Sequence, residues 1–256
     1  MPRKVPILES FEFFIIASAA VVFAGVSKGG FGSGAAFVAA AGLATVIDPG
    51  QAIGLMLPLL MLMDVTSLKP YWGQWLKKES LYLCLGGMPG VALGVWFYSL
   101  ADADMLRLLI GVISLLFVLW QAIQAYGFVP RAKEKLPPWA GGLAGVAAGF
   151  TSFVSHAGGP PAAIYLLSAK PSKTEYQATT VIVFWVINIA KALPYSFLGL
   201  FTWETLKLDL MLAPFALLGV WLGVRAHHLI SERFFFLLTY VLLVLTGVRL
   251  IWVALS

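Results

Sequence analysis

Charge is scarce in this sequence: Asp, Glu, Lys and Arg make up 11% of its 256 residues, against about 25% in an average soluble domain. Hydrophobic residues make up 60% of the chain. The longest polar stretch, GFVPRAKEKLPP at 127–138, is too short to form a water-soluble domain. These shortages exclude a soluble enzyme and leave room for at most about ten membrane spans of roughly 20 residues each.

Metal-binding and nucleotide-binding patterns are also missing. The one cysteine, Cys84, cannot form a disulfide within the chain. No cluster of Cys, His and carboxylates has metal-ligand spacing, and no GxxxxGK[ST] sequence occurs. The basic residues sit singly or in short clusters between apolar runs, which indicates membrane topology and not nucleic-acid binding. We therefore expect no metal, no cofactor and no nucleic-acid partner.

Apolar runs bounded by charged or turn residues predict ten membrane segments. Eight are long enough to span a bilayer as helices: 11–28, 51–68, 80–99, 105–126, 138–154, 176–199, 208–225 and 234–255. The segments 34–47 and 159–169 are shorter, which favours broken, re-entrant or tilted short helices. The predicted fold is an all-α polytopic membrane protein.

The chain also shows an internal duplication. Both short segments follow a glycine-rich sequence, KGGFGSGAA at 28–36 and SHAGGPPAA at 155–163. Further pairs match at a sequence offset of 124 or 129: Asp64 with Asn188, Tyr71 with Tyr195, and Gly90 and Gly94 with Gly219 and Gly223. The register at the glycines is open, because VSK at 26–28 also aligns with VSH at 154–156, at an offset of 128.

Loop charge predicts opposite orientations for the two halves. Basic residues in the loop around 69–78 and in the linker at 128–136 predict that both are cytoplasmic. The corresponding loops of the second half carry the reversed sign pattern. We therefore predict two inverted repeats of about five segments each, at 1–127 and 137–256, joined by the basic linker.

The two glycine-rich breaks predict an anion site near the membrane midplane. A helix that restarts inside the membrane presents unpartnered N–H groups and the positive end of its dipole. The candidate substrate-binding residues at the breaks are Lys28, Gly29, Gly30, Gly32, Ser33 and Gly34, with Ser155, His156, Gly158, Gly159 and Pro160. Close helix packing is the alternative role of such glycines, and we favour it for the Gly90/Gly94 and Gly219/Gly223 pairs, within one chain or in a homo-oligomer.

Charged side chains inside apolar runs are functional candidates in membrane proteins. Lys28 is either a counter-charge for the substrate or a lysine that reaches the lipid headgroups. His156 either binds an anion or a proton, or is a neutral histidine hydrogen-bonded to backbone. Asp64 is the leading proton-coupling candidate, with His156. Asn188 and Lys191, on one helical face, are predicted substrate ligands, with a structural Asp–Lys pair as the alternative.

The remaining candidate residues do not form a catalytic pattern. Ser155 and His156 raise the hypothesis of a membrane hydrolase, but adjacent residues rarely present a nucleophile and its base to each other. No GxSxG sequence is present. Tyr71 and Tyr195, each preceded by a proline, are predicted anchors at the membrane interface. We expect no catalytic residue and no enzyme activity.

The sequences KGGFGSG and TSFVSHAGGPP resemble the TauE/SafE family of sulfite exporters, and the similarity covers nearly the whole chain. The resemblance implies a permease of the bacterial inner membrane, a secondary carrier of sulfite, sulfoacetate or other organosulfur anions. Many members have three consecutive glycines followed by a proline. In this chain Ser33 and Ala35 interrupt the glycines, and no proline occurs before Pro49, which bears on selectivity.

The sequence therefore predicts a secondary transporter that exports a small anion through the lipid bilayer, coupled to protons. Two alternatives remain: an uncoupled anion channel or facilitator, and a membrane-embedded enzyme acting on a lipid or peptide. A membrane subunit that assembles with a partner is a third, non-catalytic possibility.

Overall fold

The computed structural model describes residues 8, 10–32, 36–125, 134–226 and 232–256, and these form α-helices, one π-helical segment and no strand. The elements are α1 (Phe11–Val26), η2 (Ser27–Phe31), α2 (Phe37–Leu43), α3 (Pro49–Tyr71), α4 (Lys77–Leu100), α5 (Ala103–Ala125), α6 (Pro138–Ser155), α7 (Gly159–Ser168), α8 (Lys173–Phe197), α9 (Trp203–Ala226) and α10 (Glu232–Leu255). The prediction of an all-helical fold is confirmed.

Seven helices in the described part of the chain are long and apolar enough to cross a membrane: α1 continued by η2, then α3, α4, α5, α8, α9 and α10. The chain is a multi-pass membrane protein. The sequence predicted eight long spans, and α6 is the one that falls short of this criterion. Its 18 residues include four glycines, two serines and a threonine, and its mean hydropathy falls below the value that the seven spans reach.

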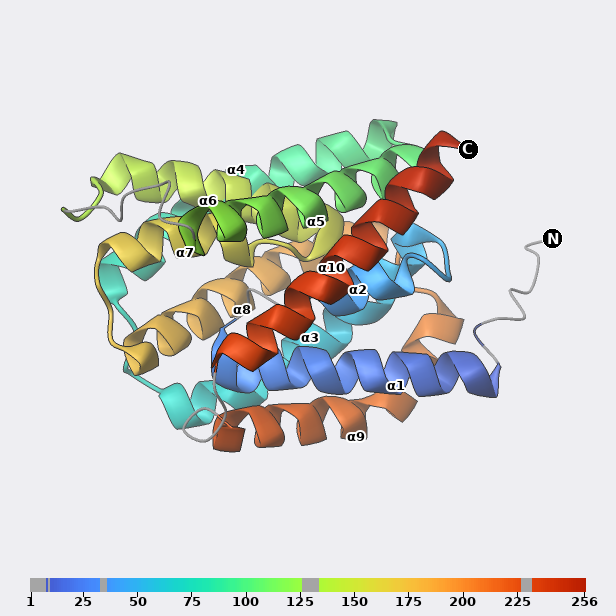
Figure 1. Ribbon diagram of the computed structural model, residues 1–256, viewed down its shortest axis with the longest axis horizontal. Helices are drawn as coiled ribbons and strands as arrows, with labels where there is room; N and C mark the ends of the chain where they lie inside the picture. Colours follow the sequence, from blue (N-terminus) through green and yellow to red (C-terminus); the bar gives the residue numbers. More distant parts are fainter. Residues whose placement is uncertain (1–7, 9, 33–35, 126–133, 227–231) are drawn as a thin grey trace.

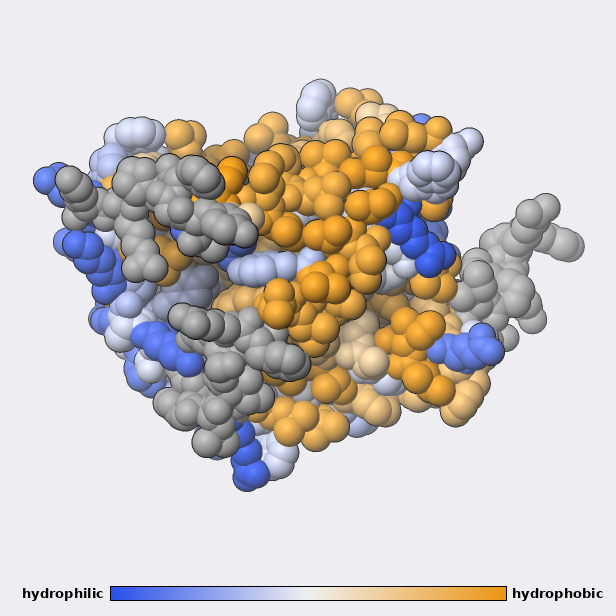
Figure 2. Space-filling view, in the orientation of Figure 1, coloured by the Kyte–Doolittle hydropathy of each residue, from blue (hydrophilic) through white to orange (hydrophobic). Residues whose placement is uncertain are grey.

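Long helices lie side by side along one axis of the molecule (Figure 1). On the face shown in Figure 2, apolar residues form a broad central band and hydrophilic residues gather toward the two ends. One end holds the start of α4 and the segment before α6, which the ion pair between Glu79 of α4 and Lys135 joins. The hydrogen bond to Glu79 raises the pKa of Lys135.

Two pairs of helices run parallel and pack through glycines. A Cβ atom added at Gly25 of α1 would lie 2.8 Å from the Cα of Gly219 in α9, and one added at Gly30 would meet Gly223. Likewise a Cβ at Gly90 of α4 would meet Val146 of α6, and one at Gly94 would meet Phe153. The interpretation of these glycines as packing residues is confirmed, and the contacts lie within one chain.

Two other pairs run antiparallel. In α3 and α8, Asp64 bonds Asn188, while Tyr71 near the end of α3 packs on Ala178 near the start of α8. In α5 and α10, Gln121 near the end of α5 donates to Tyr240, while Gly111 lies beside Ile251.

The helix pairs just described are preserved when each of α1–α5 is replaced by its counterpart among α6–α10, and each of α6–α10 by its counterpart among α1–α5. The α1–α9 pair becomes the α6–α4 pair, α3–α9 becomes α8–α4, and α1–α2 becomes α6–α7, each of which also packs together. The α3–α8 and α5–α10 pairs map onto themselves. The two halves thus meet along several helix pairs, and the α3–α8 pair carries Asp64 and Lys191.

Candidate functional site

Asp64 lies at the contact between the two halves and binds one side chain from each. It forms an ion pair with Lys28 through Oδ1, and Asn188 Nδ2 donates to its Oδ2 at 2.6 Å. All three residues are at most 3% exposed. The carboxylate therefore links η2 of the first half to α8 of the second.

Lys191, one helical turn from Asn188, is fully buried and bonds only uncharged groups among the described residues. Its Nζ lies 2.9 Å from the carbonyl oxygen of Ser152, 3.0 Å from its Oγ and 2.8 Å from His156 Nδ1. These three acceptors match the three donors of an ammonium. We call Lys28, Asp64, Asn188, Lys191, Ser152 and His156 the central cluster.

His156 adopts a definite tautomer. Its Nε2 lies 2.9 Å from the carbonyl oxygen of Ile53, which can only accept a hydrogen bond. Nε2 therefore carries the hydrogen, and Nδ1 accepts from Lys191. His156 thus bonds backbone, as the second of its two predicted roles requires, while its binding of an anion or a proton stays a prediction.

The expectations for the two lysines need correction. Lys28 does not reach toward headgroups, because it is 3% exposed and paired with Asp64. The Asp–Lys pair exists, but the partner of Asp64 is Lys28 and not Lys191. The sequence offered Lys191 because it lies near Asn188, whereas the bend at η2 brings Lys28 onto α3.

Equivalent contacts define the register between the halves. The Tyr71 hydroxyl donates to the carbonyl of Gly29 at 2.7 Å, and the Tyr195 hydroxyl donates to the carbonyl of Phe153 at 2.5 Å. Both tyrosines and both acceptors are 124 residues apart. The two breaks also agree, because Gly32 (φ +82°) and His156 (φ +58°) adopt positive φ at the same offset.

At the offset of 124, Lys28 corresponds to Ser152. The contacts favour this register over the alignment of VSK with VSH that the sequence left open. The prediction for the two tyrosines needs correction. Tyr71 and Tyr195 are 5% and 0% exposed, so they are buried bracing residues and not anchors at the membrane interface.

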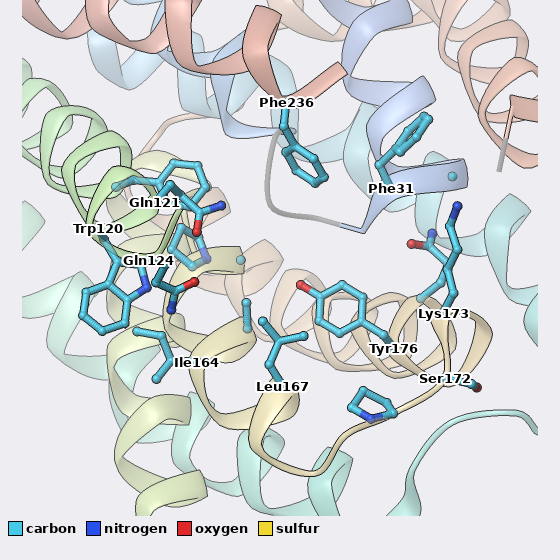
Figure 3. Close-up of a pocket in the computed structure, with 17 residues that line it drawn as sticks. Phe31, Trp120, Gln121, Gln124, Ile164, Leu167, Ser172, Lys173, Tyr176 and Phe236 are labelled. Carbon is cyan, nitrogen blue, oxygen red and sulfur yellow. The ribbon is translucent and has the colours of Figure 1, made fainter. Parts of the chain in front are cut away.

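A cavity of about 370 Å³ lies beside the two breaks, between α5, α7, α10 and the start of α8 (Figure 3). Of the predicted site residues, Gly30, Gly159 and Pro160 line it. Gln177 also lines it, is 1% exposed, and donates through Nε2 to the Lys28 carbonyl. Gln177 therefore separates the cavity from the central cluster.

Comparison with known proteins identifies the family. A family model described as "Sulfite exporter TauE/SafE" matches residues 17–250. The chain belongs to the TauE/SafE family. Neither the curated proteins nor the solved structures contain a match. The family is one of transporters, so membership agrees with the expected absence of enzyme activity.

The glycines of this TauE/SafE chain lie mostly against other helices. Cβ atoms added at Gly29 and Gly30 would meet the backbone of α9, and one at Gly158 would meet Phe184. Gly159 and Pro160 begin α7. Ser33 and Gly34 lie outside the described residues. At the start of α7, Pro160 and the proline after it have no N–H, so few backbone donors remain there for an anion.

Ser155 has no hydrogen bond to its neighbour His156 in the described structure. Its Oγ donates to the carbonyl of Thr151, while both ring nitrogens of His156 are engaged by Ile53 and Lys191. This arrangement gives no support to a serine nucleophile.

Ser152 and Gln177 were not among the residues predicted from the sequence. Applying the offset of 124 to the lysines would have selected Ser152, because it is the counterpart of Lys28. No pattern in the sequence marked Gln177.

Proposed function

We propose that this chain is a secondary transporter that exports sulfite or a small organosulfonate across the bacterial inner membrane. The observation that carries the proposal is the composition of the central cluster: two buried lysines and a single carboxylate among its described contacts. With both lysines protonated, the cluster would carry one surplus positive charge, which suits a family of anion exporters.

Inverted repeats at 1–127 and 137–256 form part of the proposal. The antiparallel α3–α8 and α5–α10 pairs support it, since each pair joins equivalent helices of the two halves. Rocking one half against the other would open the cluster to either side. Lys69 in the last turn of α3, Lys77 and Lys78 in the first turn of α4, and Lys135 before α6 lie at one end of the bundle, which supports a cytoplasmic linker at 128–136.

The substrate anion, in this proposal, neutralises Lys191. A buried ammonium costs free energy unless it is paired, and its three present acceptors carry no formal charge. A sulfite or sulfonate group offers three oxygen acceptors and a negative charge. The anion would therefore replace Ser152 and His156 as the partner of Lys191.

Proton coupling would arise at Asp64. A proton on Asp64 cancels the negative charge that balances Lys28, which leaves two positive charges in the cluster and favours anion binding. By reciprocity, a bound anion favours the proton. The proton and the anion would thus cross together, and the outward anion gradient would have to exceed any inward proton gradient for export. His156, whose Nδ1 faces Lys191, is the second coupling candidate.

The experiment is flux of sulfite, sulfoacetate, taurine and sulfate into liposomes containing the purified protein, with and without an imposed proton gradient. We expect saturable flux of one anion that the gradient accelerates. Lys191→Met should lower this flux at least about tenfold, whereas Lys207→Met, at an exposed position on α9, should leave it unchanged.

Two further variants test the roles within the cluster. Asp64→Asn should retain anion flux and lose its response to the gradient. If Lys28→Ala and His156→Ala both leave anion affinity and flux unchanged, the charge assignment is wrong. A wild-type flux that never responds to the gradient would instead favour an uncoupled channel.

A further inference from the structure

We propose, building on the rocking motion of the transport function above, that Asp209 of α9 is a proton-binding site that controls the contact between α1 and α9. With the proton bound, the neutral carboxyl stays packed between the helices. Once the proton leaves, the carboxylate needs water, and α9 moves away from α1. Since α1 belongs to the first half and α9 to the second, pH would control how readily the halves part.

Asp209 is buried without a partner. The residue is 7% exposed, and neither of its carboxyl oxygens has a hydrogen-bond partner within the described structure. No ion pair among the described residues includes it. Burial of an ionised carboxylate without a cation or hydrogen-bond donors costs far more free energy than burial of the neutral acid. The closed contact between α1 and α9 therefore suits Asp209 with its proton bound.

The surroundings of Asp209 are apolar. Leu208 and Leu212, which flank it on α9, belong to a buried core with Ala17 of α1 and Leu55 of α3. The elements packed against α9 are α1, η2 and α3. None of the other titratable side chains described on these four elements bonds Asp209. They are Glu12, Lys28, Asp64, Lys69, Tyr71, Glu204, Lys207 and Arg225. Asp209 thus takes up or releases its proton with no bonded charge to compensate it.

The register of α1 and α9 places Ser18 opposite Asp209. A Cβ atom added at Gly25 would lie 2.9 Å from the carbonyl oxygen of Ala216. Ser18 and Asp209 each precede this contact by seven residues, about two turns of the two parallel helices. Ser18 is 8% exposed, and its Oγ also has no hydrogen-bond partner among the described residues. A hydroxyl from one half and a carboxyl from the other therefore occupy facing positions.

The contact two turns further along is too tight for water. At Gly25 and Gly219 the backbones of α1 and α9 touch, because an added Cβ would lie within 3.0 Å of the opposite helix from either side. Hydration of Asp209 therefore requires α9 to move away from α1.

Asp209 lies toward one end of the bundle. It follows Trp203, the first residue of α9, by six residues, or about 9 Å along the helix. Leu200, just before α9, packs on Gly54 near the start of α3, whereas the end of α3 and the start of α4 lie at the opposite end (Figure 1). With a cytoplasmic linker before α6, Asp209 would respond to the pH on the outer side.

Acid should favour the closed contact and alkali the open one. The closed contact holds the proton tightly, whereas a hydrated aspartate in the open contact ionises above about pH 4. The open form therefore binds fewer protons, and a rise in pH shifts the equilibrium toward it. We expect the ratio of open to closed molecules to rise by up to about tenfold per pH unit between about pH 5 and 8.

The test is the distance between nitroxide labels at Phe11→Cys and Trp203→Cys, measured by double electron–electron resonance on the full chain in lipid nanodiscs. Both positions are exposed, at the starts of α1 and α9. Cys84→Ser removes the native thiol. We expect a single short distance at acidic pH and a growing population with a longer distance as the pH rises.

Three variants assign the effect to Asp209. Asp209→Asn keeps a neutral side chain of the same shape, so the labels should stay at the short distance at every pH. Asp209→Glu restores a titratable group and should restore the response. Glu204→Gln, which removes an exposed carboxyl of the same helix, should keep the full response of the parent chain.

A distance that does not change with pH, or a response that survives in Asp209→Asn, would overturn the inference. If anion flux is observed together with a constant distance, the transport function stands and the proton site fails. If the distance responds through Asp209 but no anion crosses the liposome membrane, the proton site stands and the transport function fails. A distance that changes when choline replaces sodium at constant pH, but not with pH, would assign Asp209 to a metal cation and overturn the proton site.

Discussion

In the first half of the chain, Lys28 of η2 pairs with Asp64 on α3. In the second half, Ser152 occupies the position equivalent to Lys28, and Asn188 the position equivalent to Asp64. The second lysine, Lys191, corresponds to Ser67 of the first half. Each half therefore contributes one lysine, but Lys28 follows α1, the first helix of its half, whereas Lys191 lies on α8, the third helix of its half. The tyrosine-to-backbone hydrogen bonds are repeated in the two halves, and the charged residues are not.

This comparison separates two tasks for buried lysines. Lys28 has a carboxylate partner, so its charge is compensated within the protein. Lys191 has only neutral partners among the described residues, so its charge is available to an anion. A symmetric frame can thus hold a structural ion pair on one side and a binding charge on the other.

The largest expected difference is in stability. Lys28→Met should lower the free energy of unfolding by roughly 3–5 kcal/mol, because it leaves the Asp64 carboxylate buried without its cation. Lys191→Met should cost much less, because no carboxylate loses its partner. Denaturant unfolding of the purified protein in detergent measures both.

The control for this prediction is the double variant Lys28→Met/Asp64→Asn, which removes both charges and should recover most of the loss. Equal losses for Lys28→Met and Lys191→Met would show that both lysines are structurally paired.

The glycine contacts should respond equally in the two halves. Gly25→Ala and Gly149→Ala, at equivalent positions of α1 and α6, push a methyl group into the backbone of Gly219 and of Gly87. Each should destabilise the fold by about 1–3 kcal/mol. Gly142→Ala is the matched control on α6, because its Cβ would have no atom within 4 Å. A shift in melting temperature for Gly142→Ala as large as the other two would contradict the packing.

Much of the fold followed from the sequence because the membrane restricts the choices. Long apolar runs must be helices in lipid, and the two short segments appear as α2 and α7. The predicted long span that is not among the seven is α6. Its glycines let α4 approach closely, and the same glycines lower the mean hydropathy of α6.

The site was less predictable from the sequence. Charge within apolar runs selected Lys28, Asp64 and Lys191, and the repeat selected Asn188 as the counterpart of Asp64; all four lie in the central cluster. Their pairing depends on the π-helical turn at 27–31 and on the left-handed His156, which no periodic pattern reveals. Gln177 acquires its role only where α8 crosses η2.

The smallest expected effect tests the repeated frame itself. Tyr71→Phe and Tyr195→Phe each remove one buried hydroxyl that bonds a backbone carbonyl, of Gly29 and Phe153 respectively. Each should cost about 1 kcal/mol. If the halves are equivalent, the two losses should agree within about 0.5 kcal/mol and add in the double variant, because the hydroxyls bind separate helices. A loss confined to one tyrosine would show that the two halves share a backbone arrangement but not the stabilising effect of this hydrogen bond.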